Sequence, residues 1–166
     1  MRIALTGNPN SGKTTMYNAL TGSNEKVGNW AGVTVDKKER PIKKAYTGGE
    51  QIFAVDLPGA YSMSPFTSEE SITRDYVKKE NPDIIINIVD ATNLSRSLFF
   101  TTQILELGIP VVVALNKSDI NKKKETKIDN ETLSALLGCP VVNTISTSSD
   151  GLKAVVQTAI DNINNT

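Results

Sequence analysis

Residues 7–14 of the chain read GNPNSGKT, which matches the pattern G-x-x-x-x-G-K-[ST] of phosphate-binding loops. The stretch follows a short apolar run at 3–5 and precedes an amphipathic run at 13–20, so it lies between an expected strand and an expected helix. Glycines let such a loop turn its backbone N–H groups toward phosphate oxygens, and the following helix adds its dipole. The sequence therefore predicts a phosphate-binding loop.

Two side chains of this loop have specific expected roles. Lys13 is expected to place its ammonium group on the β- and γ-phosphates of a nucleotide, and Thr14 to offer its hydroxyl to Mg²⁺. The predicted phosphate-binding residues are consecutive: Gly7, Asn8, Pro9, Asn10, Ser11, Gly12, Lys13, Thr14 and Thr15.

A second motif stands at 56–59, where an apolar run ends in Asp-Leu-Pro-Gly, a D-x-x-G pattern. A carboxylate at the end of a strand beside a phosphate loop can hold Mg²⁺ through a water molecule, which is the role predicted for Asp56. Gly59 is expected to approach the γ-phosphate with its backbone N–H. An Asp before a Pro-Gly turn is also ordinary loop chemistry, so the motif gains its weight from following the phosphate loop.

A third motif, Asn-Lys-Ser-Asp at 116–119, follows the apolar run 110–115. The carboxylate of Asp119 can accept both the ring N–H and the exocyclic amine of guanine, whereas adenine presents no such pair of donors. Asn116 is expected to hold the far side of the base, and the stem of Lys117 to pack over its face. The order of the three motifs predicts a guanine-nucleotide site and disfavours an ATPase.

The composition narrows the remaining possibilities. The chain has 166 residues, of which 39% are hydrophobic and 22% charged, as is usual for one globular domain. Its 18 Lys and Arg residues balance 18 Asp and Glu residues, which argues against binding nucleic acid through bulk charge. The absence of His excludes His-based triads and the usual zinc sites, and the single Cys139 excludes an internal disulfide. With neither a long apolar run nor a signal peptide, we expect a cytosolic chain.

Short apolar runs alternate with amphipathic ones, which is typical of an α/β fold with a mostly parallel sheet. A hairpin is expected around Gly48-Gly49. The expected strands are 3–5, 33–46, 51–56, 84–89, 110–115 and 140–144, and the expected helices are 13–20, 68–79, 94–107, 130–137 and 151–163.

Five stretches carry a resemblance to a known family: GNPNSGKTT (7–15), VGNWAGVTV (27–35), DLPGAY (56–61), VDATNL (89–94) and LELGIP (105–110). The chain resembles GTPases of the TRAFAC class, and in particular the N-terminal G domain of the FeoB family of bacterial ferrous-iron transport proteins. The resemblance extends over essentially all 166 residues.

The resemblance implies a P-loop NTPase G domain: a six-stranded, mostly parallel sheet with one antiparallel edge strand and helices on both faces. Residues 1–166 would form this single domain, with switch I at about 22–35 and switch II at about 57–68. In the family, this domain lies at the cytoplasmic face of the inner membrane and is followed by a helical regulatory domain and a membrane permease. The chain shows neither, so we expect it to correspond to an excised G domain.

The resemblance also implies further binding residues. Thr34 falls at the switch I position whose hydroxyl joins Mg²⁺ when GTP is bound. Ser146 and Thr147 fall in the loop that contacts the base, where this chain reads S-T-S in place of the usual S-A-K.

The catalytic aids of many GTPases are missing from the sequence. Ala60 stands where others carry the Gln that orients water, and 22–35 contains no Arg to act as a finger. Resemblance to potassium-activated relatives implies that Asn10 holds K⁺, together with backbone carbonyls near Gly28 and Trp30. The candidate catalytic set is therefore Lys13, Thr34, Gly59 and Asn10.

The function expected from the resemblance is Mg²⁺-dependent hydrolysis of GTP to GDP and phosphate, with slow intrinsic turnover. It would act as a switch that regulates ferrous-iron uptake through an attached permease, with K⁺ as activator and no nucleic acid as partner. Two alternatives stay open: a freestanding GTPase of the ribosome-assembly kind, and a GTP sensor with negligible hydrolysis.

Overall fold

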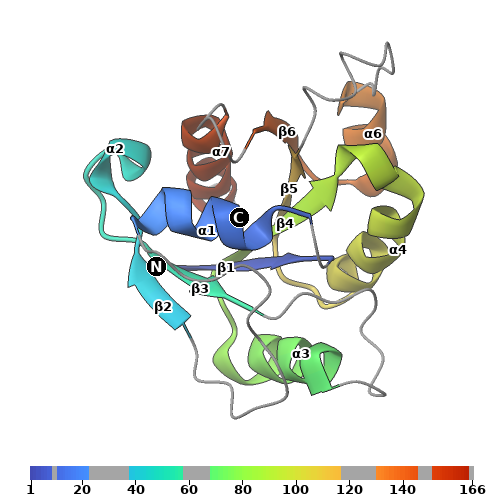
Figure 1. Ribbon diagram of the computed structural model, residues 1–166, viewed down its shortest axis with the longest axis horizontal. Helices are drawn as coiled ribbons and strands as arrows, with labels where there is room; N and C mark the ends of the chain where they lie inside the picture. The colour runs from blue at the N-terminus through green and yellow to red at the C-terminus, as the bar shows by residue number, and fades with distance from the viewer. Residues whose placement is uncertain (9–10, 23–37, 58–67, 117–129, 146–150, 165–166) are drawn as a thin grey trace.

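The structure is a computed structural model of the chain, and it describes residues 1–8, 11–22, 38–57, 68–116, 130–145 and 151–164. Within these residues the strands form one six-stranded sheet in the order β2-β3-β1-β4-β5-β6 (Figure 1). The strands are β1 (Arg2–Gly7), β2 (Lys38–Pro41), β3 (Phe53–Asp56), β4 (Ile84–Asp90), β5 (Val111–Asn116) and β6 (Val141–Thr144). The edge strand β2 runs antiparallel to β3, and every other neighbouring pair is parallel.

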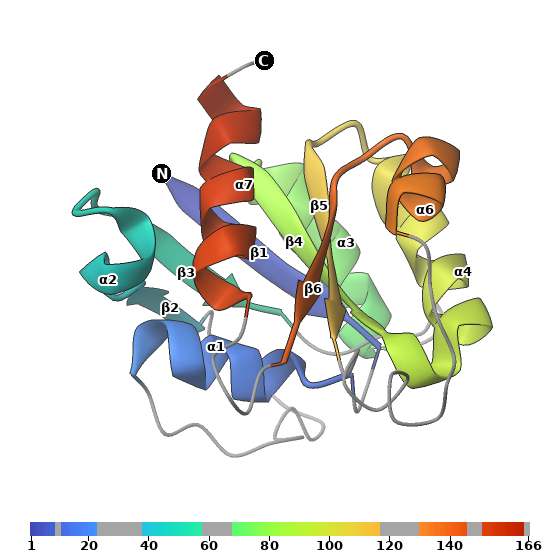
Figure 2. The same ribbon diagram turned by 90° about the horizontal axis from the view of Figure 1, so that it is seen from above.

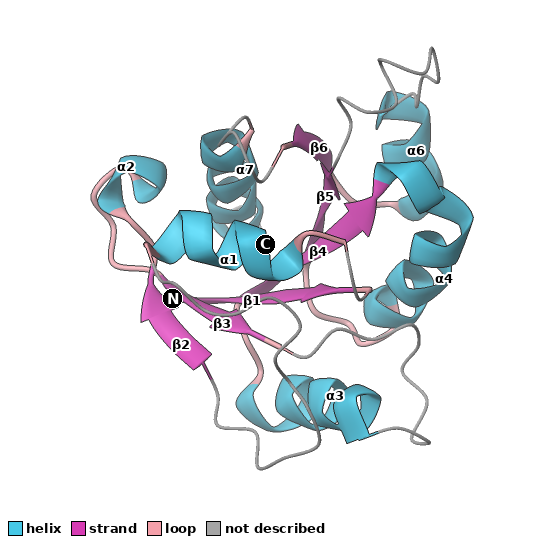
Figure 3. Cartoon of the chain, in the orientation of Figure 1, coloured by secondary structure: helices cyan, strands magenta, loops and turns pink. Residues whose placement is uncertain are grey.

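Helices cover both faces of the sheet, which Figure 2 shows from above and Figure 3 by secondary structure. The helices are α1 (Lys13–Thr21), α2 (Lys44–Thr47), α3 (Ser68–Glu80), the 3₁₀ turn η1 (Ala91–Asn93), α4 (Leu94–Leu105), α6 (Asn130–Leu137) and α7 (Leu152–Asn164). The predicted fold class is confirmed. None of the helices in the described ranges has both the length and the apolar character that a bilayer span requires.

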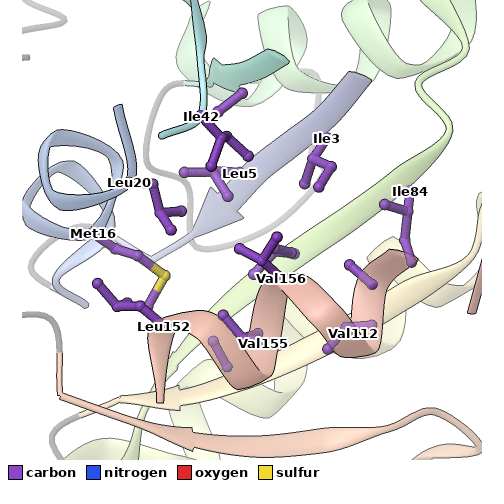
Figure 4. Close-up of a cluster of buried hydrophobic side chains, with 14 of the residues drawn as sticks. Ile3, Leu5, Met16, Leu20, Ile42, Ile84, Val112, Leu152, Val155 and Val156 are labelled. Atoms are coloured by element: carbon purple, nitrogen blue, oxygen red, sulfur yellow. The ribbon is translucent and has the colours of Figure 1, made fainter. Parts of the chain in front are cut away.

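The side-chain alternation of the strands divides the core into two layers. Alternate residues of β1 and β4, such as Leu5 and Ile86, lie in a cluster with α1 and α7, and Figure 4 shows this cluster from the side of the helices. The intervening residues, such as Ala4 and Ile85, lie in a second cluster with α3 and α4. Because both faces are covered, β4 and β5 are nearly continuous apolar runs, as expected for central parallel strands.

One expected element is wrong in its extent. Residues 33–46 were expected to form a strand, but β2 ends at Pro41 and the short helix α2 follows. Proline has no N–H to donate to a ladder, and buried Ile42 and half-buried Tyr46 belong to the core cluster under α7. Gly48, with φ of 68°, caps α2 instead of forming a tight hairpin turn. The antiparallel pairing of β2 with β3 agrees with the hairpin topology.

Candidate functional site

The three sequence motifs begin where parallel strands end. Gly7 is the last residue of β1, Asp56 the last of β3, and Asn116 the last of β5. Because these strands are parallel members of one sheet, their carboxyl ends share one edge, which is where open α/β sheets bind ligands.

The phosphate loop rests on strand β4. A Cβ atom at Gly7 would lie 2.7 Å from the carbonyl oxygen of Ile88 and 2.9 Å from Oγ of Ser11, so no side chain fits there. The N–H of Ser11 donates to the carbonyl of Asn8 at 3.2 Å, and both residues are buried. The turn continues directly into α1, whose first helical bond runs from the N–H of Met16 to the carbonyl of Gly12 at 2.9 Å.

Lys13 at the start of α1 forms an ion pair with Asp56 at the end of β3. Lys13 is 5% exposed and Asp56 1%, so both charges are withdrawn from water. A buried charge is costly unless an opposite charge accompanies it, which makes this pair a strong constraint on the site. The cation predicted to meet phosphate thus touches the carboxylate predicted to hold Mg²⁺.

The chemistry of these residues fits magnesium. Thr14 follows Lys13 on the first turn of α1 and is also buried, and it carries a hydroxyl oxygen, while Asp56 carries a carboxylate. Oxygen ligands of this kind are those that Mg²⁺ prefers. Among the residues that the structure describes, no cluster of three or more His, Cys, Asp or Glu side chains indicates a metal site of another kind.

Asn116 joins the third motif to the phosphate loop. Its Nδ2 donates to the carbonyl of Ser11 at 2.9 Å, and its Oδ1 accepts from the Thr144 hydroxyl at 3.2 Å. These three residues are buried and come from the loop, β5 and β6. Sequence analysis missed Thr144, which belongs to no spaced motif, and the role of the Ser11 carbonyl, because a backbone group at a variable position of the loop motif leaves no signal in the sequence. The Ser11 hydroxyl itself is buried and has no hydrogen-bond partner among the residues that the structure describes.

Several predicted site residues lie outside the described residues, so the structure does not test their roles. They are Pro9, Asn10, Gly28, Trp30, Thr34, Gly59, Lys117, Asp119, Ser146 and Thr147. Thr15, the last predicted phosphate-binding residue, lies half-buried on α1.

The single cysteine lies away from this edge. Cys139 precedes the amino end of β6, whereas the candidate site lies at the carboxyl ends. Burial raises the pKa of its thiol to about 11, so the thiol is protonated and unreactive at neutral pH.

Similarity to known proteins extends beyond the three motifs to nearly the whole chain. A family model described as ferrous iron transport protein B matches residues 1–159. The Fe(2+) transporter FeoB of Salmonella typhimurium is 49% identical over 168 aligned residues, which cover 99% of this chain and 21% of that transporter. The same transporter from Escherichia coli K12 is 49% identical over 165 residues, which cover 97% of this chain and 21% of that protein. The chain therefore spans about a fifth of the length of these relatives.

Solved structures agree with this family. NFeoB from S. thermophilus bound to GDP.AlF4⁻ and K⁺ matches with a TM-score of 0.88 and 46% identity, covering 100% of this chain and 63% of that one. The FeoB G-domain from Methanococcus jannaschii matches with a TM-score of 0.85 and 39% identity, covering 98% and 97% of the two chains. The chain belongs to the ferrous iron transport protein B (FeoB) family and corresponds to its G domain.

Proposed function

We propose that the chain binds guanine nucleotides at the carboxyl edge of its sheet and hydrolyses GTP to GDP and phosphate. The observation that carries this proposal is the meeting of three motifs that are distant in sequence. Lys13 of the phosphate loop contacts Asp56 of D-x-x-G, and Asn116 of N-K-x-D bonds to Ser11 of the loop. The presence of GDP.AlF4⁻ and K⁺ on NFeoB from S. thermophilus supports the same ligands here.

Each predicted site residue discussed above that the structure describes has a role in this proposal. The ammonium of Lys13 binds the β- and γ-phosphates, and the N–H groups of the loop surround them. Thr14 and Asp56 hold Mg²⁺, the latter through water, and the metal would neutralise charge on the phosphates. Asn116 fixes the base side of the site to the phosphate side through the Ser11 carbonyl.

Catalysis needs positive charge near the phosphates. Among the described side chains of the site, only Lys13 supplies it. An intrinsic turnover of about 4 × 10⁻⁴ s⁻¹ corresponds to an activation barrier of about 22 kcal/mol, and an arginine finger lowers this barrier by about 7 kcal/mol. In our proposal, Asn10 and backbone carbonyls near Gly28 and Trp30 bind K⁺, which would supply that charge. Thr34 and Gly59 would contact Mg²⁺ and the γ-phosphate.

The wider role rests on the family. We propose that 1–166 is one G domain with switches at 22–35 and 57–68, at the cytoplasmic face of the membrane. Its partners in the longer protein would be a helical regulatory domain and a permease for ferrous iron, and its nucleotide state would regulate uptake. Nucleic acid is not a proposed partner, because the charges of the chain balance.

Single-turnover hydrolysis tests the proposal. GTP and Mg²⁺ are mixed with excess protein in KCl or NaCl at equal ionic strength, with Asn10→Ala as the matched variant. We expect faster turnover in KCl and loss of that difference in the variant. Equal, barely measurable rates in both salts, with intact GTP binding, would reject hydrolysis and favour a sensor. Tighter binding of ATP than GTP would reject the site itself.

A further inference from the structure

A buried carboxamide interrupts the apolar run of β4. Asn87 stands between Ile86 and Ile88 and is 1% exposed. A buried amide is costly unless its donor and acceptor are both bonded. The Oδ1 of Asn87 accepts from the Thr6 hydroxyl at 3.1 Å, and its Nδ2 donates to the Thr101 hydroxyl at 2.6 Å. The Asn87 side chain therefore links β4 to the neighbouring strand β1 and to α4, which packs on that face of the sheet.

The hydrogen bonds form a continuous chain with one direction. The Thr6 hydroxyl donates to Asn87, Asn87 donates to Thr101, and the Thr101 hydroxyl donates to the carbonyl of Ser97 at 3.0 Å. Each hydroxyl hydrogen is used once. A carboxamide suits the middle position because it offers an acceptor and a donor together; leucine offers neither, and a carboxylate offers no donor.

Thr6, at one end of this series of hydrogen bonds, lies at the base of the phosphate loop. Thr6 pairs with Asn87 in the parallel register, and Gly7 pairs with Ile88. Thr6, the residue before Gly7, is therefore held by its side-chain hydrogen bond to Asn87. Gly7 is held by its close approach to the Ile88 carbonyl. Two successive residues at the entry to the loop are fixed on two successive residues of β4.

The other end holds the start of α4. The N–H of Asp90 donates to the Ser97 hydroxyl at 3.2 Å, and the Asp90 carboxylate caps the 3₁₀ turn by accepting from the N–H of Thr92 at 2.9 Å. Ser97 and Thr101 are both buried on the inner side of the helix. The position of α4 and the position of the phosphate loop are therefore set by the same buried residues.

From this arrangement we infer that Asn87 is a positioning residue for nucleotide binding. It touches neither phosphate nor base in the proposed site, and it acts by fixing Thr6 and Gly7 relative to α4. The inference rests on the proposed function, because it concerns affinity at that site. A purely structural carboxamide would affect stability alone, because its loss would leave buried donors and acceptors without partners and would not change the affinity for nucleotide.

The test measures affinity and stability separately. Binding of fluorescent GDP and GTP gives dissociation constants and off-rates, and thermal unfolding of the nucleotide-free chain gives midpoints. The variants are Asn87→Leu, Thr101→Val and the conservative Thr101→Ser, all assayed well below their midpoints. The matched control is Thr47→Val, because Thr47 is equally buried and donates to the Glu50 carbonyl at 2.8 Å in α2.

We expect Asn87→Leu and Thr101→Val to weaken nucleotide binding about tenfold, mainly through faster release, and Thr101→Ser to bind almost as the wild type does. Thr47→Val should lower the midpoint without changing affinity. Wild-type affinity in both Asn87→Leu and Thr101→Val would overturn the inference while leaving the proposed function intact. If Asn87→Leu does not fold, Thr101→Val decides the question alone. A wild-type chain that binds no guanine nucleotide would overturn both.

Discussion

The two faces of the sheet bury different kinds of polar group. On the side of α1 and α7, an apolar cluster ends at the charged pair of Lys13 and Asp56. On the side of α3 and α4, an apolar cluster ends at the neutral chain of Thr6, Asn87 and Thr101. Both polar groups lie toward the carboxyl ends of the strands, where the candidate site is.

The difference separates an exchangeable contact from a permanent one. A buried ion pair is stable only while each charge faces an opposite charge, and phosphate can take over from a carboxylate in facing Lys13. In the neutral series each polar side-chain atom of Thr6, Asn87 and Thr101 has a hydrogen-bond partner, and none carries a charge that a ligand could replace. One face is therefore suited to respond to ligand, and the other to hold the loop in place.

The largest expected effect comes from breaking the charged pair. Lys13→Met should lower the unfolding free energy of the nucleotide-free chain by about 3–5 kcal/mol, because the Asp56 carboxylate stays buried without the opposite charge of Lys13. The double variant Lys13→Met/Asp56→Leu should recover most of this loss. Denaturant unfolding measures both, with Lys43→Met as an exposed control. Equal instability of the single and double variants would show that the pair is not what stabilises this face.

The apolar part of the same face gives the next effect. Ile86 of β4 is fully buried in the core cluster that includes residues of α1 and α7, so Ile86→Ala should cost about 2–5 kcal/mol through lost burial and a cavity. Leu136→Ala, at a side chain that is 80% exposed, should change stability by less than about 0.5 kcal/mol. Urea unfolding of the two variants checks the contrast. A loss below about 1 kcal/mol at Ile86 would contradict the packing described.

A pH titration tests the burial of Cys139 on the other face of the sheet, where α3 and α4 pack. Cys139 packs in a cluster with residues of β4 and β5 that lie on the α4 side. Since burial raises the pKa of its thiol to about 11, folding favours the protonated form. Its contribution to stability is complete below the ordinary thiol pKa, and is lost as pH rises through about 11. The wild type should therefore lose about 2 kcal/mol relative to Cys139→Ala between pH 8 and pH 11. A constant difference across this range would refute the burial of the thiol.

The smallest effect is expected at a surface ion pair. Arg2 and Glu80 approach to 3.3 Å at the edge opposite the candidate site, and their side chains are 37% and 32% exposed. The hydrogen bond from Arg2 to Glu80 raises the pKa of the guanidinium, but water and salt screen such a pair. Glu80→Gln should change stability by at most about 1 kcal/mol, and by less at high salt. A loss as large as that from Lys13→Met would remove the distinction between buried and exposed pairs.

Much of the fold follows from patterns that the sequence displays. The apolar runs at 84–89 and 110–115 match β4 and β5 to within a residue at each end, because helices cover both faces of these central strands and almost all of their residues are apolar. The extent of the expected strand at 33–46 is wrong, because α2 is only four residues long and depends on packing beneath α7. Local pattern carries no record of such a contact.

The candidate site likewise has residues that the sequence predicts and contacts that it does not. The motifs identify Lys13, Asp56 and Asn116, because phosphate and guanine chemistry demands these residue types at these spacings. The contact of Lys13 with Asp56 joins residues 43 positions apart, and only the parallel pairing of β1 and β3 brings them together. Asn87 reads as one polar residue within an apolar strand, and its partners Thr6 and Thr101 come from other elements.

The edge strand β2 has a consequence for solubility at high concentration. Its sequence is Lys-Glu-Arg-Pro, and Glu39, Arg40 and Pro41 are exposed. A strand arriving from another molecule would meet charged side chains, and at Pro41 it would find no N–H to pair with. The sheet therefore resists growth by strand addition at this edge, and these side chains protect the chain against fibrous aggregation.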